Sequence, residues 1–448
     1  MRKVHMVSLG CAKNRVDSEV MVGILQGDTF EFVGDPDDAE VIVVNTCSFI
    51  RAATDESIDT VLEMAKFKEQ GRCKRLVVTG CMVQRYGRAL ESELPEVDNF
   101  LGTGEYHRIG QILRERGEPK IRTWLDEPTF LHTDANPRVN SWSPSSAYLK
   151  ISEGCDHTCT FCIIPQLRGK HRSRTIDSLV VEARRLVDQG VVELNLVSQD
   201  STAYGRDLRD GTGLGGLMRE LAKIEDLRWM RLHYAYPHGL PDGLLEALRD
   251  EPKVCRYLDM PLQHASGPML QAMKRGVTRD GQERILKRVR DAVPDIALRT
   301  TFIVGFPGET DADFAELCDF VKEQRFDHVG VFTYSEEDGT PAAELPNQVP
   351  ERVREERQQE LMRLQAELSA GRLKARVGEI MPVLIEGTSP ESELVIVGRT
   401  EYQAPDVDGI VYVGKAPDDV KVGEIRPVLI TASSQHDLVG EIVGDDSM

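Results

Sequence analysis

Long apolar runs are absent from this chain of 448 residues, and its first segment, MRKVHMVSLGCAKN, holds neither an apolar stretch nor a small-residue cleavage pattern. Nowhere do about eighteen apolar residues follow one another, which is the length that a membrane-spanning helix needs. The sequence therefore predicts no membrane partner and no secretory signal. We expect a soluble protein of the cytoplasm.

Cysteine and positive charge are both scarce. Nine cysteines are too few for a disulfide scaffold in a chain of this length, so metal binding becomes the leading explanation for those that follow a pattern. The 55 Lys and Arg residues are outnumbered by 74 Asp and Glu residues, which gives a formal charge of -19. This negative charge argues against binding of nucleic acid by bulk electrostatic attraction. It favours a basic partner instead.

Three apolar, β-branched runs in the first hundred residues each end in a cysteine. They are VHMVSLGC at Cys11, VIVVNTC at Cys47 and RLVVTGC at Cys81. Each predicts a buried parallel strand followed by a helix, and the alternation predicts a doubly wound α/β domain over residues 1–117. Because the carboxyl ends of such strands meet at one crevice, the three thiols are expected to face each other. A three-thiolate cluster is favoured over coincidence.

The rest of the chain divides by pattern into four parts. Residues 118–146 are rich in proline and predict a linker, and residues 147–349 hold six strand-and-helix units, a partial (βα)6 barrel two units short of eight. Residues 350–375 predict a charged, solvated connecting helix. Residues 376–448 contain short strands between Gly and Pro turns, which predicts a small β-barrel of the oligonucleotide-binding kind.

The segment EGCDHTCTFCIIP places Cys155, Cys159 and Cys162 in a C-x3-C-x2-C spacing. A closed zinc site of four cysteines is disfavoured, because no further cysteine follows within about ninety residues, although His157 could bind a metal. Three cysteines directly after a barrel strand suit an iron-sulfur cluster that leaves one iron open to a small chelating molecule. A structural metal loop is the alternative. Three other cysteines follow no pattern and are assigned no chemistry: Cys73, Cys255 and Cys318.

This spacing resembles the signature of the radical S-adenosylmethionine enzymes, including an aromatic residue, Phe161, before the last cysteine. Together with the three-cysteine domain and a terminal barrel that resembles a TRAM module, the whole chain resembles the methylthiotransferase family. The segments SLGCAKNRVDSE and ISEGCDHTCTFCIIPQLRG resemble its branch that methylthiolates the β-carbon of an aspartate in the twelfth protein of the small ribosomal subunit. A sibling branch modifies an adenosine in tRNA.

The resemblance implies two 4Fe-4S clusters and S-adenosylmethionine, which serves as methyl donor and as radical source. It implies one cluster on the C-x3-C-x2-C triplet and an auxiliary, sulfur-carrying cluster on the three N-terminal cysteines. It also implies an electron donor such as flavodoxin or ferredoxin, and a ribosomal target that is either free or assembled. An alternative of another class is a non-catalytic iron-sulfur protein that docks on ribosomes or senses redox state.

Loops after the barrel strands supply further candidates for binding the cofactor, because parallel barrels hold their active sites at these strand ends. By position, Gln199 and Asp200 follow the second strand, and Gly305 and Gly308 follow the fifth. All four, with Phe161, are candidates for contacting S-adenosylmethionine. Ordinary loop and capping roles are an equally good interpretation of each.

The charge of the last domain bears on the choice of substrate. Residues 376–448 contain five Lys or Arg against fourteen Asp or Glu, a net charge of -9. A barrel so acidic would repel a phosphate backbone, but it could steer toward a ribosomal protein rich in lysine and arginine. A surface that is merely soluble is the alternative. The charge therefore favours a basic ribosomal protein over tRNA.

Overall fold

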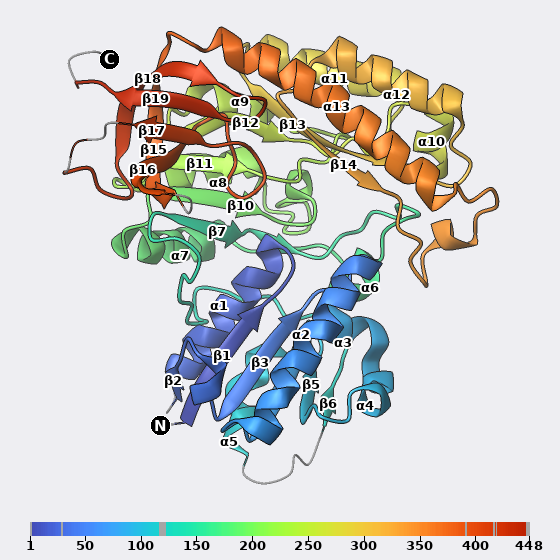
Figure 1. Ribbon diagram of the computed structural model, residues 1–448, viewed down its shortest axis with the longest axis vertical. Helices are drawn as coiled ribbons and strands as arrows, with labels where there is room; N and C mark the ends of the chain where they lie inside the picture. The colour runs from blue at the N-terminus through green and yellow to red at the C-terminus, as the bar shows by residue number, and fades with distance from the viewer. Residues whose placement is uncertain are drawn as a thin grey trace.

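The computed structural model describes residues 2–27, 30–115, 122–389, 392–414, 417 and 419–444. Figure 1 shows an N-terminal α/β domain below a larger α/β barrel, with a small β-barrel at one end of the latter. The predicted boundary between residues 117 and 118 lies outside the described residues, as does Lys415.

The N-terminal domain is built on a sheet of six parallel strands in the order β2-β1-β3-β4-β5-β6. Both central strands, β3 and β4, are buried along their whole length, because α1 and α5 cover one face and α2 and α3 cover the other. This confirms the doubly wound domain. The elements are β1 (Arg2–Ser8), α1 (Ala12–Gln26), β2 (Phe30–Phe32), β3 (Val41–Thr46), α2 (Arg51–Gln70), β4 (Arg75–Gly80), α3 (Cys81–Tyr86), α4 (Leu90–Glu93), β5 (Asn99–Leu101), α5 (Ile109–Arg114) and β6 (Thr123–Trp124).

The segment predicted as a linker is more ordered than its proline content suggests. Its residues Thr123 and Trp124 form β6, which pairs with β5 and extends the first sheet. Farther on, the side chain of Arg138 is buried and binds Glu19 of α1 and Glu182 of the barrel. A strand of two residues gives no periodic signal, and the ion pairs are made by residues far away in the sequence.

The second domain is an open barrel of six parallel strands in the order β14-β13-β12-β11-β10-β7, which confirms the partial (βα)6 architecture. Apolar side chains of the strands and the surrounding helices form its core. The strands are β7 (Ser146–Lys150), β10 (Glu193–Val197), β11 (Trp229–Leu232), β12 (Val254–Asp259), β13 (Ala297–Val304) and β14 (His328–Thr333). The helices are α6 (Ile164–Arg168), α7 (Ile176–Asp188), α8 (Leu214–Ala222), α9 (Asp242–Asp250), α10 (Gly267–Ala272), α11 (Arg279–Ala292) and α12 (Asp311–Gln324).

The long helix α13 (Glu351–Ala375) is not the solvated connector that its charge predicts. It packs on the barrel through a stripe at four-residue spacing, in which Leu361 is fully buried in the barrel core. Arg357 in the same stripe binds Glu309 and Asp311. The prediction was wrong because the buried stripe is mostly polar: Arg357, Leu361, Gln365 and Ser369.

The C-terminal domain is a closed five-stranded barrel, as predicted. Its strands are β15 (Ile380–Ser389), β16 (Ser392–Thr400), β17 (Val411–Gly414), β18 (Ile425–Ser433) and β19 (Leu438–Ile442). Leu384 and Ala404 pack against residues at the beginnings of β11, β12 and β13. The small barrel therefore covers the end of the large barrel that lies opposite the carboxyl ends of its strands.

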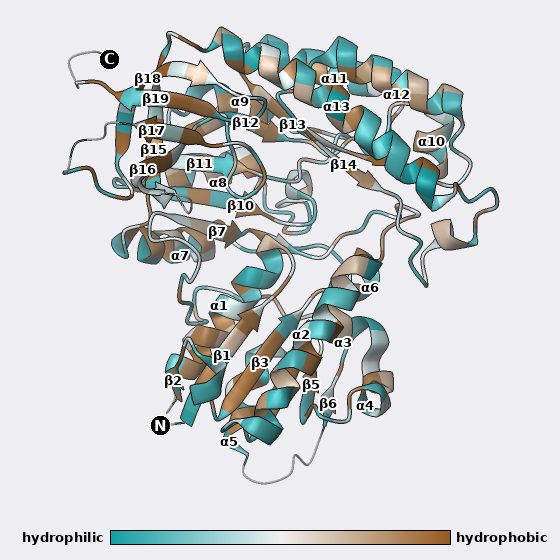
Figure 2. Ribbon diagram, viewed as in Figure 1, coloured by the Kyte–Doolittle hydropathy of each residue, from teal (hydrophilic) through white to brown (hydrophobic). Residues whose placement is uncertain are grey.

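Hydropathy follows this architecture. In Figure 2 the brown, apolar strands lie inside the domains, and the outer faces of α2 and α13 are largely teal. No helix in the described part of the chain has the length and apolar character needed to cross a membrane.

Candidate functional site

The three N-terminal cysteines stand where strands of the first sheet end. Cys11 precedes the first turn of α1, Cys47 directly follows β3, and Cys81 begins α3 after β4. Thr46 pairs with Gly80 in the parallel ladder, so the residues that follow them, Cys47 and Cys81, leave the sheet side by side. The structure thus brings together the strand ends from which these thiols project.

Gly10 lets the Cys11 turn approach Cys47. Its φ angle is +83°, a left-handed conformation that glycine adopts without strain, and a Cβ built there would lie 2.6 Å from the Cβ of Cys47. Gly154, before Cys155, has φ +81°, and an added Cβ would lie 2.1 Å from the carbonyl oxygen of Lys170. A glycine directly before the cysteine is thus part of both sites, a signal that the cysteine spacing alone did not reveal.

The N-terminal thiols influence one another's pKa, as thiols at neighbouring strand ends should. The pKa of Cys81 is raised to about 12, first by burial and then by Cys47 and Cys11, although Arg168 opposes the shift. Burial and then Cys11 likewise raise the pKa of Cys47. Bound metal would have to displace these protons, as it does in thiolate sites generally.

The second triplet lies in the loop between β8 (Ser152–Glu153) and α6, at the carboxyl end of β7. Cys159 is buried, and Cys155 and Cys162 are partly exposed. Burial raises the pKa of Cys155 to about 11 and that of Cys162 to about 12, and neighbouring thiols of the triplet contribute to both shifts. These three thiols therefore also form one group.

The donor sets fit iron-sulfur clusters better than single metal ions. In the described ranges, no three His, Cys, Asp or Glu side chains are grouped as ligands of one metal ion. Ligands of a single zinc ion converge on one point, whereas three thiolates of a cluster bind three different irons. Two groups of three thiols, each at the end of parallel strands, agree with the second arrangement.

The N-terminal triad is Cys11, Cys47 and Cys81, and the barrel triad is Cys155, Cys159 and Cys162. Each triad has an arginine that contacts one of its sulfurs, and neither arginine was singled out from the sequence. Arg168 Nη2 lies 3.5 Å from Cys81 Sγ, and Arg275 Nη1 lies 3.4 Å from Cys159 Sγ. Both guanidinium groups are buried. Hydrogen bonds to cluster sulfurs help to set reduction potentials, so the two arginines are well placed to tune the two sites separately.

A buried ion network joins the two triads. Arg168 follows the second triplet on α6 and binds Asp17 of α1 at 2.5 Å, while Lys150 bridges Asp17 and Glu153. Burial would raise the pKa of Glu153, but Lys150 and Arg168 hold that pKa well below its usual range. The two domains are thus fixed to each other at the site by charge.

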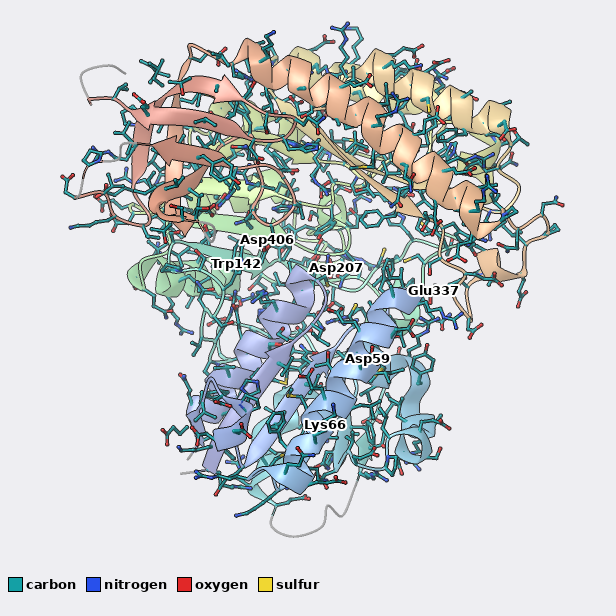
Figure 3. The ribbon with its side chains drawn as sticks, in the orientation of Figure 1. Asp59, Lys66, Trp142, Asp207, Glu337 and Asp406 are labelled. Carbon is teal, nitrogen blue, oxygen red and sulfur yellow. The ribbon has the colours of Figure 1, made fainter. Side chains whose placement is uncertain are left out.

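A second contact between the domains involves Glu337, which Figure 3 labels beside the ends of α2 and α6. Its carboxylate accepts a hydrogen bond from the backbone N–H of Arg51 at 2.6 Å and pairs with Arg85 at 2.7 Å. Both partners belong to the N-terminal domain. Glu337 therefore fastens a loop of the barrel to the elements that carry Cys47 and Cys81.

The two polar cofactor candidates of the second strand have different surroundings. Gln199 donates from Nε2 to Glu153 at 2.7 Å, and its Oε1 is buried with no hydrogen-bond partner in the described residues. Asp200 accepts from the backbone N–H of Thr202 and from His157, whose Nε2 lies 2.7 Å away. An unsatisfied oxygen suits ligand binding at Gln199, whereas Asp200 and His157 bind each other.

Phe161 and the two candidate glycines lie around the same end of the barrel. Phe161 packs against an apolar cluster that includes Phe306 and Tyr334. Gly305 has φ +71°, and a Cβ there would lie 2.3 Å from Arg354 Cγ of α13, whereas nothing lies within 4 Å of a Cβ at Gly308. Gly305 therefore allows a close approach of α13, and Gly308 faces open space. Their binding of S-adenosylmethionine stays a prediction.

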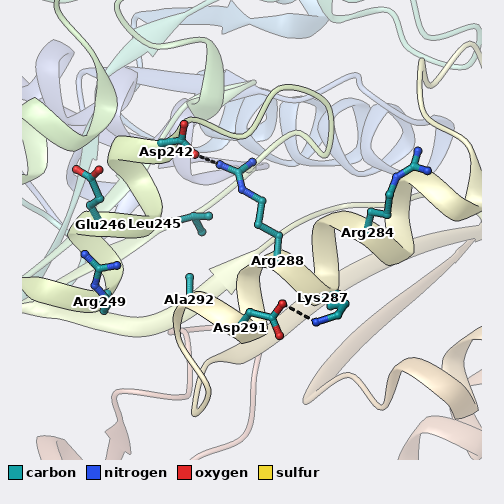
Figure 4. Close-up of a pocket in the computed structure, with 9 residues that line it drawn as sticks. All are labelled: Asp242, Leu245, Glu246, Arg249, Arg284, Lys287, Arg288, Asp291 and Ala292. Carbon is teal, nitrogen blue, oxygen red and sulfur yellow. Dashed lines mark hydrogen bonds and ion pairs between the residues drawn. The ribbon is translucent and has the colours of Figure 1, made fainter.

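The three remaining cysteines are all buried, as packing roles require: Cys73, Cys255 and Cys318. A groove of about 610 Å³ between α9 and α11 also lies apart from the cysteines (Figure 4). Its charged side chains bind one another, as in the pairs Arg288–Asp242 and Lys287–Asp291. Nothing in this groove matches the chemistry of the cysteine sites.

Family models match three parts of the chain. Residues 3–102 match Uncharacterized protein family UPF0004, residues 149–321 match the Radical SAM superfamily, and residues 377–443 match the TRAM domain. A uS12 methylthiotransferase RimO of Citrifermentans bemidjiense is 52% identical over 445 residues, which cover 98% of each chain. The RimO of Geobacter sulfurreducens is 50% identical over 442 residues, again 98% of each chain.

This chain belongs to the RimO family. Membership agrees with the methylthiotransferase resemblance of the sequence, and it makes the protein a radical S-adenosylmethionine enzyme with two 4Fe-4S clusters. That the two groups of three thiols hold these clusters stays a prediction from the sequence and from their placement at the strand ends.

Solved structures support the fold. The radical S-adenosylmethionine methyltransferase TsrM of Kitasatospora setae superposes with a TM-score of 0.55 at 15% identity, covering 76% of this chain and 77% of TsrM. The cobalamin-dependent enzyme OxsB gives a TM-score of 0.53 at 12% identity, covering 81% of this chain and 56% of OxsB. At such low identity these likenesses concern the architecture only.

Proposed function

We propose that this protein methylthiolates the β-carbon of an aspartate in ribosomal protein uS12, using the N-terminal and barrel triads as ligands of two distinct clusters. The observation that carries this proposal is the presence of two three-thiol groups joined by the buried network of Arg168, Asp17 and Lys150. About half of all positions are identical to those of curated uS12 methylthiotransferases over nearly the whole chain.

Each triad has a separate role in the proposal. When bound, the clusters and S-adenosylmethionine supply the hydrogen-abstracting radical and the methylsulfide group. The chain's own residues hold these groups in one fixed arrangement, because Arg168 and Glu337 connect the domains. Gln199, with its unsatisfied oxygen, would accept a hydrogen bond from S-adenosylmethionine, and Phe161 would exclude water beside the triplet.

The partner in this proposal is basic uS12, and tRNA is the disfavoured substrate. The charge of the C-terminal barrel supports this choice, because the basic Arg399 is buried against Glu193 and cannot face a phosphate. A flavodoxin or ferredoxin would supply electrons, and the reaction would take place in the cytoplasm.

Mass spectrometry tests the proposal directly. Small ribosomal subunits and bulk tRNA are each incubated anaerobically with reconstituted enzyme, reductant, sulfide and S-adenosylmethionine. A methylthio group on an aspartyl peptide of uS12 is expected. A methylthio group on adenosine would show that tRNA, and not uS12, is the substrate. If S-adenosylmethionine is not cleaved at all, the protein would be a non-catalytic iron-sulfur protein.

Single cysteine variants separate the two triads. Cys155→Ala should abolish both deoxyadenosine and methylthiolated product, whereas Cys47→Ala should abolish the product and keep deoxyadenosine formation. Cys318→Ala is the matched control, because this thiol packs in the barrel core and should leave both yields unchanged. Loss of deoxyadenosine in Cys47→Ala would show that the N-terminal triad has only a structural role.

A further inference from the structure

Lys13 is a buried cation beside the N-terminal triad. It lies in the first turn of α1, two residues after Cys11, and only 9% of its surface is exposed. In the part of the chain that the structure describes, no Asp or Glu forms an ion pair with it. Lys150, which is also buried and belongs to the neighbouring domain, is bound by both Asp17 and Glu153. The groups that favour the charge of Lys13 are Tyr234 and the Cys11 thiolate, so among the described residues Lys13 lacks the carboxylate partner that buried ammonium groups usually have.

An aromatic ring offsets part of this cost. The Lys13 ammonium lies over the ring of Tyr234, with Nζ 3.5 Å from the ring centroid. Tyr234 is held there in a left-handed backbone conformation, φ +69°, and its carbonyl accepts a hydrogen bond from the backbone N–H of Ser201. Strained residues of this kind are typical of functional sites. A neutral ring attracts the cation but supplies no carboxylate to pair with it.

The Lys13–Tyr234 pair is a contact between the N-terminal domain and the barrel. Lys13 belongs to the helix that begins at Cys11, whereas Tyr234 belongs to the loop after the barrel strand β11. Two residues further on, Tyr236 stacks on His157, which lies in the loop that carries the barrel triad, and the ring centroids are 3.7 Å apart. Lys13 is thus two residues from a cysteine of the first triad, and Tyr234 is two residues from a ring that contacts the loop of the second.

We propose that Lys13 binds the side-chain carboxylate of the substrate aspartate and thereby selects an acidic residue as the target. This inference rests on the proposed function. The carboxylate is attached directly to the β-carbon that is to be modified, so fixing it by a charge-assisted hydrogen bond places that carbon at this contact between the two domains. A neutral purine base would offer the ammonium no carboxylate, which disfavours adenosine at the same position.

A double-mutant cycle between enzyme and substrate tests the contact. Binding of isolated uS12 and of uS12 with its target aspartate changed to asparagine is measured for wild-type enzyme and for Lys13→Met. In the wild type, the asparagine substrate should bind about tenfold to a hundredfold more weakly, which is the range of a charge-assisted hydrogen bond. In Lys13→Met the two substrates should bind equally. Lys13→Arg should keep part of the discrimination.

Controls separate this contact from damage to the protein. Lys66→Met removes an exposed lysine of α2 in the same domain, visible in Figure 3, and should preserve the full discrimination. Iron content and the visible absorption of Lys13→Met should equal those of the wild type. The affinity for S-adenosylmethionine is measured in parallel, because its carboxylate is the other anion at hand.

Two results would overturn the inference. Equal sensitivity of wild type and Lys13→Met to the asparagine change would show that Lys13 does not contact this carboxylate. A loss of affinity for S-adenosylmethionine without coupling to the substrate would assign Lys13 to the cofactor instead. Failure of the proposed function is distinguishable, because wild-type enzyme would then modify no aspartate of uS12 at all.

Discussion

Arg168, six residues beyond the last cysteine of the barrel triad, points its guanidinium at the first residue of α3: Nη2 lies 3.5 Å from Cys81 Sγ. One short segment, residues 155–168, thus contains the cysteines of one triad and a hydrogen-bond donor to the other. Cys81 also packs against Ile163 and Leu167 of the same segment. The segment that carries the barrel triad is therefore in direct contact with the N-terminal triad.

Arg168→Gln should lower the reduction potential of the N-terminal cluster by on the order of 50 mV, because a positive donor stabilises the more negative reduced state. An electron paramagnetic resonance titration in the Cys155→Ala background measures this cluster alone. Lys170→Gln removes an exposed charge from the same loop and should leave the potential unchanged. Equal shifts in both variants would indicate a general charge effect instead of the Cys81 contact.

Arg275→Met should weaken the barrel cluster specifically. Arg275 donates to Cys159 Sγ and, through Nη2, to the carbonyl of Pro261 at 2.7 Å, so its loss removes a donor and loosens the loop. After dialysis against a chelator, we expect iron to be lost from one cluster of two, with deoxyadenosine formation falling about tenfold or more. Arg275→Lys should keep part of the iron and part of the deoxyadenosine formation. Retention of all iron would contradict this role.

Arg399→Met should destabilise the whole protein by about 3–5 kcal/mol, because it leaves Glu193 buried with fewer cationic partners. Arg399 Nη2 lies 2.5 Å from Glu193 and ties the C-terminal barrel to β10. Urea unfolding measures the change. Glu246→Gln, which breaks an exposed pair with Arg219, should change stability by no more than about 0.5 kcal/mol.

Glu193 should also make the free energy of unfolding depend on pH in the acidic range. Burial would raise its pKa, but Arg399 and Arg231 hold the pKa at about 2 in the folded protein. Its ordinary value is 4.5, so its contribution is present above pH 4.5 and is lost as the pH falls toward 2. The loss amounts to about 3 kcal/mol. Glu193→Gln should flatten this part of the stability curve, and a curve parallel to that of the wild type would refute the assignment.

Neutralising exposed acids of the C-terminal barrel, as in Glu379→Gln combined with Asp419→Asn, should slow association with basic uS12 severalfold at low salt. Binding of tRNA should strengthen in the same variant. Asp319→Asn with Glu323→Gln on α12 removes the same charge elsewhere and serves as the control. Stopped-flow association at two salt concentrations measures the effect, and weaker tRNA binding would contradict the electrostatic argument.

Sequence patterns were sufficient for the architecture because buried parallel strands leave continuous apolar runs, such as VIVVNTC before Cys47. They failed where a contact depends on distant residues. Helix α13 buries a polar stripe that no hydropathy pattern reveals, and β6 consists of two residues that gain their strand conformation only by pairing with β5. The cysteine spacing pointed to the thiols but not to the arginines that contact them.

The sequence by itself determined three domains in order, the two groups of three cysteines and the acidic C-terminal barrel, since each is written in local pattern or composition. Only the tertiary structure decided how the groups are arranged. Arg168 and Lys150 meet Asp17 because two separately coded domains pack together, and burial then makes these charges strong. The same packing leaves Lys13 over Tyr234 with no carboxylate beside it in the described residues, a relationship between positions more than two hundred residues apart.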